Sequence, residues 1–236
     1  MRKAVILAAG RGTRMQALTA TRPKPMLEVA GKPLLEHIAG RLGEAGFDDL
    51  LIITGYHAEM IEKHFAGWRL PVAFKRQETP NGTGAAALLA KRWAGDEPFL
   101  LTFGDIVMAG EDYRAMACVL DTQPECEAVM AVQWVDDPAA GAAVYEQAGR
   151  VERVVEKPPA LTSATHWNSA GGYAFRPGIF DELERIPMSP RGEYEITSAI
   201  EQLLAAGRRV MIHAVRGAWR DVGRPEDLIG AGELFS

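Results

Sequence analysis

Apolar residues in the first half of the chain occur in two alternating patterns. Short continuous runs, such as the one from Ala4 to Ala8, are typical of strands buried on both faces of a sheet. Between these runs, apolar residues recur at helical spacing, as in the segment that Pro33 opens and Gly46 ends. The predicted strands cover residues 4–8, 50–53, 72–75 and 99–103, and the predicted helices cover residues 33–45, 57–65 and 83–93. This alternation predicts a mainly parallel sheet.

More closely spaced strands follow residue 127. They are predicted at residues 128–133, 143–145, 151–155 and 172–175, and helices are predicted near Ile179 and Thr197. No linker or low-complexity segment separates the two halves of the sequence. We therefore predict one α/β domain over residues 1–236, with a Rossmann-like, mixed, mainly parallel central sheet and helices on both faces. Open sheets of this kind bind ligands at the carboxyl ends of their strands.

The composition narrows the classes of partner. A chain of 236 residues, 47% of them hydrophobic, can bury one large core. A net charge of −5 without a broad basic surface argues against a polymeric nucleic acid as partner. No apolar run approaches transmembrane length, and the first one is too short for a signal peptide, so we expect a cytoplasmic protein without a membrane partner. Cys118 and Cys126 have neither CxxC spacing nor nearby histidines, which indicates reduced thiols.

A glycine-rich segment follows the first predicted strand. It reads LAAGRGTR at residues 7–14, and PKP follows at residues 23–25. Glycines let backbone amides approach a phosphate chain, and Arg14 and Lys24 can neutralise its charge, although glycines also form ordinary tight turns. A Walker A loop is excluded because it needs GK followed by Ser or Thr. A dinucleotide fingerprint is excluded because Met15 stands where it needs a third glycine.

This segment resembles the N-terminal signature of the sugar-phosphate nucleotidyltransferases, the family of glucose-1-phosphate thymidylyl- and uridylyltransferases. Their pattern is LAxGxGTR followed by a PK pair, and Ala17 departs from it where proline is usual. The resemblance implies a fold of the nucleotide-diphospho-sugar transferase type, with residues 1–126 binding the nucleotide and residues 127–236 binding the sugar phosphate. It also implies that the first segment contacts the nucleotide through Leu7, Ala9, Gly10, Gly12, Thr13, Arg14 and Lys24.

The segment at residues 77–86 resembles the base-binding Q…PxGTAxA element of the same family, with Asn81 where leucine is common. The resemblance implies that Gln77, Pro80, Gly82 and Thr83 contact the nucleotide. A glutamine amide offers a donor and an acceptor, which suits a pyrimidine edge and leaves UTP and dTTP both open. The structural alternative is that Thr83 caps the helix it begins and that Gln77 is a surface residue.

Two aspartates follow apolar segments far apart in the chain. Asp105 comes directly after the strand predicted at residues 99–103, and Asp221 lies in the sequence WRDVG. By resemblance, Asp105 and Asp221 hold the Mg²⁺ that bridges the triphosphate, and magnesium accepts such a ligand set together with phosphate oxygens and water. Each aspartate alone could equally be a turn or loop residue. Ile106 replaces a common asparagine and Arg224 a frequent threonine, either of which could signal a different sugar or altered metal dependence.

Several residues of the second half resemble the family's sugar-phosphate site. Glu156-Lys157-Pro158 matches its EKP element, although an isolated Glu-Lys pair is usually solvated. The resemblance assigns sugar-phosphate contacts to Gly141, Glu156, Lys157, Asn168 and Gly171, with Gly171 leaving room for the pyranose; the match at Gly141 needs a one-residue deletion. Glu193 lies in a GExxIT-like run that is explained equally well by helix capping.

The implied reaction transfers a nucleotidyl group from UTP or dTTP to a sugar 1-phosphate, which yields an NDP-sugar and pyrophosphate. Arg14, Lys24 and Lys157 are the predicted catalytic cations, and Lys24, Asp105, Lys157 and Asp221 are expected to converge on one cleft. The five histidines show no ligand spacing and no GxSxG elbow occurs, so no covalent intermediate is expected. The sugar stays open among glucose, an N-acetylamino sugar, N-acetylmuramate and a heptose.

Two other classes of function remain as alternatives. A non-catalytic nucleotide-sugar-binding regulator could share the fold but lose the metal carboxylates. A kinase or dehydrogenase with a generic phosphate site is disfavoured by the missing GK[ST] and third glycine. We expect a monomer or homodimer of a compact, single-activity enzyme, because the sequence ends soon after the Asp221 segment.

Overall fold

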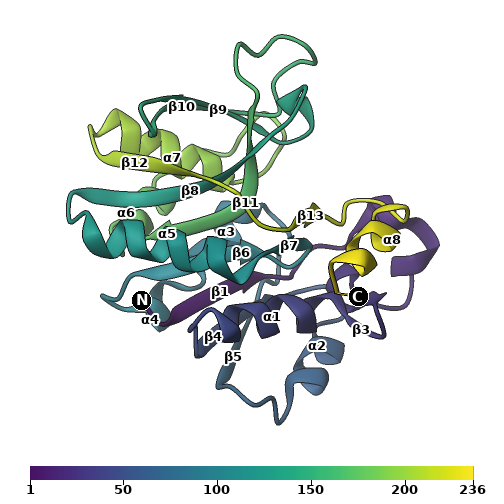
Figure 1. The fold of residues 1–236 in the computed structure, drawn as a ribbon. Helices are drawn as coiled ribbons and strands as arrows, with labels where there is room; N and C mark the ends of the chain where they lie inside the picture. Colours follow the sequence, from purple (N-terminus) through teal and green to yellow (C-terminus); the bar gives the residue numbers. More distant parts are fainter. Residues whose placement is uncertain (236) are drawn as a thin grey trace.

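The computed structural model describes residues 1–235, apart from the side chains of Gln16 and Phe235. These residues form a nine-stranded central sheet that runs through both halves of the sequence (Figure 1). In sheet order its strands are β5 (Val72–Arg76), β4 (Asp49–Thr54), β1 (Lys3–Leu7), β6 (Phe99–Phe103), β11 (Trp167–Phe175), β8 (Cys126–Trp134), β12 (Arg209–Ala214), β10 (Arg150–Glu156) and β9 (Ala142–Gln147).

Strand direction differs between the two ends of this sheet. The pairs β5–β4, β4–β1 and β1–β6 are all parallel, as the strand and helix alternation predicts. Beyond β6, the strands β11 and β10 pair antiparallel with each of their neighbours and run against the other seven. The prediction of a mixed, mainly parallel sheet is therefore confirmed in strand direction, and every antiparallel pair of this sheet includes β10 or β11.

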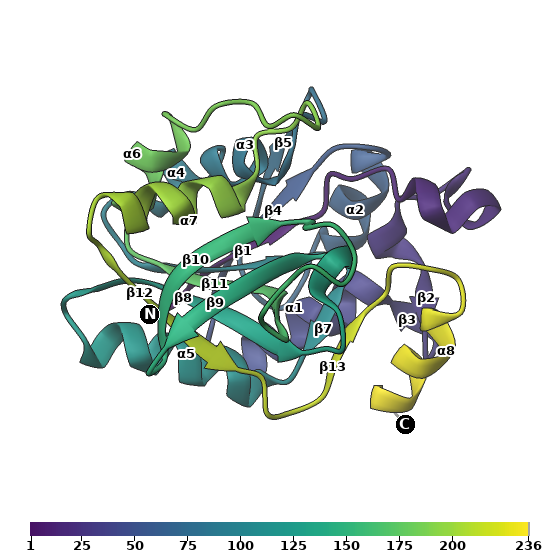
Figure 2. The same ribbon diagram turned by 90° about the horizontal axis from the view of Figure 1, so that it is seen from above.

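Two apolar layers cover the faces of the sheet. Helices α1 (Leu34–Glu44), α2 (Ala58–Phe65) and α5 (Gly110–Thr122) pack on one face, and Ala231 of α8 (Asp227–Gly232) joins the same apolar cluster. Helices α3 (Thr83–Leu88), α4 (Lys91–Ala94), α6 (Ile179–Leu183) and α7 (Ile196–Ala205) pack on the other face. Figure 2 shows α3, α4, α6 and α7 together on one side of the strands. Continuous apolar strands such as β1, whose central residues are fully buried, require this cover on both faces.

Three differences from the sequence prediction concern the main sheet and the helices that cover it. The helix predicted at residues 83–93 divides into α3 and α4, separated by a turn at residues 89 and 90. Helix α5 was not predicted, although Tyr113, Met116, Ala117 and Leu120 are spaced for one buried face. Strand β12 was also missed; it has partners on both sides, β8 and β10, that lie far from it in the sequence.

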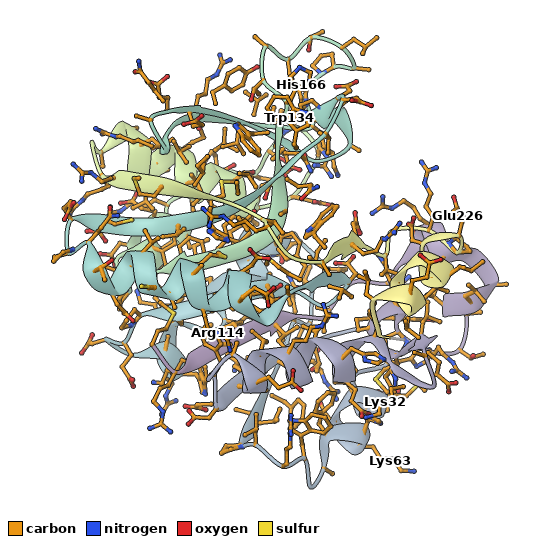
Figure 3. The ribbon with its side chains drawn as sticks, viewed as in Figure 1. Lys32, Lys63, Arg114, Trp134, His166 and Glu226 are labelled. Atoms are coloured by element: carbon orange, nitrogen blue, oxygen red, sulfur yellow. The ribbon has the colours of Figure 1, made fainter. Side chains whose placement is uncertain are left out.

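Small elements shape the edges of the sheet. The strands β7 (Ile106–Met108) and β13 (Trp219–Asp221) form a separate antiparallel pair, as do β2 (Glu28–Val29) and β3 (Lys32–Pro33). After β10, the chain extends away from the sheet and returns at β11, where the rings of Trp134 and His166 stack with centroids 4.6 Å apart (Figure 3). Within the described part of the chain, no helix has the length and apolar character needed to span a bilayer.

Candidate active site

The loop after β1 is shaped around the side chain of Lys24. Gly12 has a φ of 63°, in the left-handed region, and a Cβ there would lie 2.7 Å from Cβ of Lys24. Any larger residue would therefore be strained and would collide with the lysine stem. The Thr19 hydroxyl, at the end of the short helix η1 (Thr13–Thr19), donates to the Gly12 carbonyl oxygen at 3.1 Å. The glycine-rich segment thus folds over a buried lysine.

Lys24 is directed at the first of the two aspartates. Its Nζ lies 2.7 Å from Oδ2 of Asp105, and the lysine side chain is only 7% exposed. Asp105 directly follows the strand β6 and Gly104, whose amide donates to the Leu7 carbonyl oxygen at 2.8 Å. Neighbouring parallel strands therefore bring the glycine-rich loop and Asp105 to the same edge of the sheet.

The second aspartate reaches this edge through the small β7–β13 pair. Asp221 is opposite Ile106 in that ladder, and the Val222 amide donates to the Asp105 carbonyl oxygen at 2.9 Å. Asp221 keeps an exposed surface, but the cleft walls displace part of the water around its carboxylate. This desolvation raises its pKa to about 6, and the charge of Asp105 is the second cause. Lys24 and Arg14 oppose that rise without cancelling it.

The two carboxylates fit a divalent cation that prefers oxygen ligands. They repel each other at one edge of the sheet. A cation bound between them would offset this repulsion, which contributes to the raised pKa of Asp221. Among the described residues, no group of three or more His, Cys, Asp or Glu side chains is placed to hold a metal. Two protein carboxylates completed by phosphate oxygens and water suit magnesium better than zinc.

The base-recognition segment is tied to a loop from the other half of the chain. Nε2 of Gln77 donates to Oδ1 of Asn81 and to the Gly82 carbonyl oxygen, both at 3.1 Å. Gly82 has a φ of 114°, and a Cβ there would lie 2.4 Å from the Tyr194 carbonyl oxygen. Because both amide hydrogens of Gln77 are used, its carbonyl oxygen is the atom left to recognise a ligand donor.

Thr83 corrects one structural expectation. It is the first residue of α3, whose N-cap is Gly82, and it makes no side-chain bond to the start of that helix. Instead, its hydroxyl accepts a hydrogen bond from the Ile196 amide at 3.1 Å, at the first residue of α7. The cap therefore acts between helices from the two halves of the sequence.

These segments line a pocket of about 430 Å³ at the carboxyl ends of β1 and β6. All eleven residues predicted to bind the nucleotide line it, namely Leu7, Ala9, Gly10, Gly12, Thr13, Arg14, Lys24, Gln77, Pro80, Gly82 and Thr83. Asp105 and Glu193 line it as well. The structure thus brings the predicted nucleotide residues together, while their individual roles stay predictions.

A second pocket, of about 270 Å³, adjoins the first. Its lining includes the five predicted sugar-phosphate residues, Gly141, Glu156, Lys157, Asn168 and Gly171, together with both aspartates. The two pockets share Arg14, Thr83, Phe103, Asp105 and Glu193. The expected convergence of Lys24, Asp105, Lys157 and Asp221 on one cleft is therefore present.

Close backbone approaches shape the second pocket. A Cβ on Gly141 would lie 2.3 Å from Oδ1 of Asn168, and none of the described residues donates a hydrogen bond to that buried oxygen. Gly171 has a φ of 75°, and a Cβ there would lie 2.8 Å from the Ile106 side chain. The glycine therefore permits β11 to approach β7, a packing role that its predicted contact with a pyranose did not include.

The EKP segment turns sharply at its lysine. Lys157 has a φ of 43°, which is unusual for a residue with a side chain, and its amide donates to the Gly141 carbonyl oxygen at 2.7 Å. Burial raises the pKa of the preceding Glu156, and the negative charge of Glu195 raises it further. The exposed Lys157 ammonium and the half-buried Glu156 carboxylate both border the second pocket.

Sequence reasoning missed three residues of this pocket. Arg191, Glu195 and Thr197 all line it, and Glu195 is only 5% exposed. They belong to the run RGEYEIT, in which Glu193 was singled out and Glu195 was not. A glutamate placed directly before an apolar helix face, where it occupies the N-cap of α7, was the available signal.

Comparison with known proteins agrees with this geometry. The sequence profile described as Nucleotidyl transferase matches residues 3–235. The UTP--glucose-1-phosphate uridylyltransferase AglF of Haloferax volcanii is 35% identical over 95% of this chain and 93% of its own length. The low-salt glycan biosynthesis nucleotidyltransferase Agl11 of the same organism is 34% identical over 98% of this chain, which spans 65% of Agl11.

A solved structure shares the fold. The crystal structure of UDP-glucose pyrophosphorylase complexed with UDP-glucose superposes with a TM-score of 0.90, at 24% identity, over 100% of this chain and 98% of that one. The predicted nucleotide-diphospho-sugar transferase type of fold is confirmed by this likeness.

Proposed function

Because the chain belongs to the nucleotidyl transferase family, we propose that it transfers a nucleotidyl group from UTP or dTTP to a sugar 1-phosphate, forming an NDP-sugar and pyrophosphate. One observation carries this proposal. Two adjoining pockets share a boundary that includes Arg14 and Asp105, so two phosphorylated molecules can meet there. A protein that only binds a finished nucleotide sugar would also fill both pockets, but it would not need the two carboxylates of Asp105 and Asp221 for a metal beside them.

The first pocket receives the triphosphate. Backbone amides of the glycine-rich loop approach the phosphate oxygens, while Arg14 and Lys24 supply positive charge. The burial of Lys24 and its ion pair with Asp105 fix the ammonium before any ligand arrives. Such a fixed charge stabilises the transition state without reorganising during the reaction.

Asp105 and Asp221 would hold the divalent ion. When bound, Mg²⁺ neutralises phosphate charge and orients the reacting phosphate. The repulsion that raises the pKa of Asp221 supports this assignment, since a cation removes it. The magnesium requirement itself is part of the proposal.

The base is recognised at Gln77. Its carbonyl oxygen is the acceptor left after both amide hydrogens bond within the protein, and the N3–H group of uracil or thymine is a matching donor. The related protein AglF is a UTP--glucose-1-phosphate uridylyltransferase by name, which supports UTP. Both pyrimidine triphosphates stay in the proposal, since the N3–H donor is common to them.

The second pocket receives the sugar 1-phosphate. Lys157 pairs with the phosphate, and Glu156 accepts hydrogen bonds from sugar hydroxyls. The unpartnered, buried Oδ1 of Asn168 supports a ligand that donates hydrogen bonds, because a hydroxyl there would satisfy it. The sugar is glucose, an N-acetylamino sugar or N-acetylmuramate, and glucose has the support of the AglF name.

The reaction is an in-line attack by a sugar-phosphate oxygen on the α-phosphorus, with pyrophosphate as the leaving group. The nucleophile is already ionised, so no general base is required. Arg14, Lys24 and Lys157 offset the repulsion between the two anions, and the loop amides fix their geometry. We place this reaction in the cytoplasm, where nucleoside triphosphates are made, in a monomer or homodimer.

A panel of sugar 1-phosphates tested against the common nucleoside triphosphates with Mg²⁺ checks the proposal. Pyrophosphate release is expected with UTP or dTTP and at least one sugar 1-phosphate, and addition of EDTA should stop it. Binding of a UDP-sugar without any pyrophosphate release would instead identify a regulator on the same fold. Light scattering of the purified chain would decide between monomer and homodimer.

A further inference from the structure

The loop between α6 and α7 touches both pockets. Its residue Tyr194 bonds to the base-recognition segment twice: the Tyr194 amide donates to the Asn81 carbonyl oxygen at 2.8 Å, and the Gly84 amide donates to the Tyr194 carbonyl oxygen at 2.7 Å. Three residues earlier, Arg191 borders the second pocket. The backbone of the loop is therefore anchored on the nucleotide side, while its side chains Arg191, Glu193 and Glu195 border the sugar side.

Arg191 lies between two carboxylates. One guanidinium nitrogen, Nη1, donates to Oε1 of Glu156 at 3.3 Å and to Oε1 and Oε2 of Glu195 at 3.1 and 3.3 Å. Nη2 also lies 3.6 Å from Oε2 of Glu193. A single cation thus offsets the charges of glutamates that approach it from β10 and from the start of α7.

The rest of each carboxylate is also partnered. The Thr197 hydroxyl donates to Oε2 of Glu156 at 3.0 Å, and the Ser189 hydroxyl donates to Oε1 of Glu195 at 2.9 Å. Each oxygen of Glu156 therefore accepts one hydrogen bond from the protein and keeps capacity for another. This leaves a fixed, two-oxygen acceptor facing the second pocket.

The charges around Glu156 need Arg191. Burial and the neighbouring Glu195 raise the pKa of Glu156, whereas Thr197, Lys157 and Arg191 lower it. Without the guanidinium, the half-buried Glu156 and the buried Glu195 would be neighbouring carboxylates with less positive charge between them, which favours sharing a proton. A protonated Glu156 would turn and lose part of its ability to accept hydrogen bonds.

We infer that Arg191 is a positioning residue that holds Glu156 and Glu195 together as a paired acceptor, and that this acceptor selects a neutral, hydroxyl-bearing sugar over an acidic one. The inference rests on the proposed function and narrows its sugar substrate to glucose or a neutral N-acetylamino sugar, because N-acetylmuramate carries a carboxylate. A carboxylate on the sugar would bring a further negative charge beside Glu156, Glu193 and Glu195, where Arg191 already bridges all three and Lys157 is assigned to the phosphate.

Kinetics with the full chain test the positioning role. Arg191→Met should raise KM for the accepted sugar 1-phosphate about 10- to 100-fold while KM for the nucleoside triphosphate stays within about twofold, and Arg191→Lys should restore part of the loss. Arg185→Met, which removes an exposed arginine of the same connection, is the matched control. Equal rises in both KM values, or no rise, would overturn the inference.

A double variant separates electrostatics from loop anchoring. If Arg191 acts by offsetting Glu195, then Arg191→Met combined with Glu195→Gln should recover most of the sugar KM lost in Arg191→Met alone. Additive losses would show that the arginine only holds the loop.

Glucuronic acid 1-phosphate should be used at least about 100-fold less efficiently than glucose 1-phosphate, and comparable use would overturn the selection of neutral sugars.

A measurement without substrate keeps this inference distinct from the proposed function. Carboxyl NMR titration should give a higher pKa for Glu156 in Arg191→Met than in the unchanged protein, and a lower pKa in Glu195→Gln. If the protein used no sugar 1-phosphate, the proposed function and the inferred class of sugar would both be rejected. The pKa changes could still appear in that case, because they are measured without substrate. If an active enzyme showed neither the pKa changes nor the KM change, the function would stand and the inference would be overturned.

Discussion

The two pockets are built by different parts of the sheet. On the nucleotide side, the glycine-rich loop, Gln77 and Asp105 each follow the carboxyl end of a parallel strand, namely β1, β5 and β6. On the sugar side, Glu156 ends the antiparallel strand β10, Asn168 lies near the start of β11, and Arg191 belongs to no strand. One pocket is an edge of a parallel sheet, and the other is assembled from antiparallel strands and a helix connection.

This difference has an electrostatic counterpart. The nucleotide pocket places a buried lysine against one carboxylate, and Lys24, Arg14 and the glycine-loop amides all line the space for phosphate oxygens. The sugar pocket places one arginine against three glutamates and presents acceptor oxygens. The first pocket is therefore suited to an anion, and the second to an anion at its shared edge and to hydroxyl donors beyond it.

The largest effect is expected from removing the buried cation of the nucleotide pocket. Lys24→Met keeps a long apolar stem against Gly12 but loses the ammonium, so kcat should fall about 1,000-fold, as measured by pyrophosphate release. Lys32, an exposed lysine labelled in Figure 3, provides the control, and Lys32→Met should stay within about twofold. Near-normal turnover in Lys24→Met would remove the lysine from the proposed mechanism.

The next largest effect concerns the contact between the two halves. In Gly82→Ala, the added methyl group would meet the Tyr194 backbone at a φ that favours glycine, so the free energy of unfolding should fall by about 3 kcal/mol. Gly31 has a φ of 79° with no atom near its Cβ position, and Gly31→Ala should cost only about 1 kcal/mol. Urea unfolding of both variants checks this, and equal losses would mean that the Tyr194 contact adds nothing.

The sequence predicted the nucleotide side better than the sugar side for a physical reason. Parallel strands deliver their ends to one edge, so chain order alone indicated that the segment at residues 7–14 and Asp105 would meet. Arg191 and Glu195 could not be found this way. Their neighbour Glu156 ends β10, and the position of β10 in the sheet depends on β12, which lies between β8 and β10 and was not predicted. The resemblance, rather than periodicity, supplied Glu156, Lys157 and Asn168.

A smaller effect tests the metal site in the protein without metal. The pKa of Asp221 is raised to about 6 from an ordinary 3.8, so its ionisation destabilises the folded state as pH rises from about 4 to 6. Asp221→Asn removes that cost and should raise Tm by about 2 °C at pH 8, a modest gain because the side chain is exposed. At pH 4 the variant should have the same Tm as the unchanged protein.

Mg²⁺ binding gives a second test of Asp221 in the same experiment. Added to the unchanged protein at pH 8, it should raise Tm, and it should do so less at pH 5, where Asp221 is largely protonated. Asp221→Asn should lose most of this response. A full Mg²⁺ response in the variant would show that the ion binds without this carboxylate.

An effect of similar small size isolates one hydrogen bond between the two sides. Thr83 lines both pockets, and its hydroxyl accepts from the Ile196 amide at the start of α7. Thr83→Ala should lower the free energy of unfolding by about 1 kcal/mol and speed hydrogen exchange in the first turn of α7, whereas Thr83→Ser should do neither. Thr122→Ala, which removes an exposed hydroxyl bonded within its own helix, controls for the loss of a threonine. Unchanged hydrogen exchange at the Ile196 amide in Thr83→Ala would mean that the Tyr194 backbone alone connects the two pockets. In that case, Gly82→Ala would be the only one of these variants to disturb the start of α7.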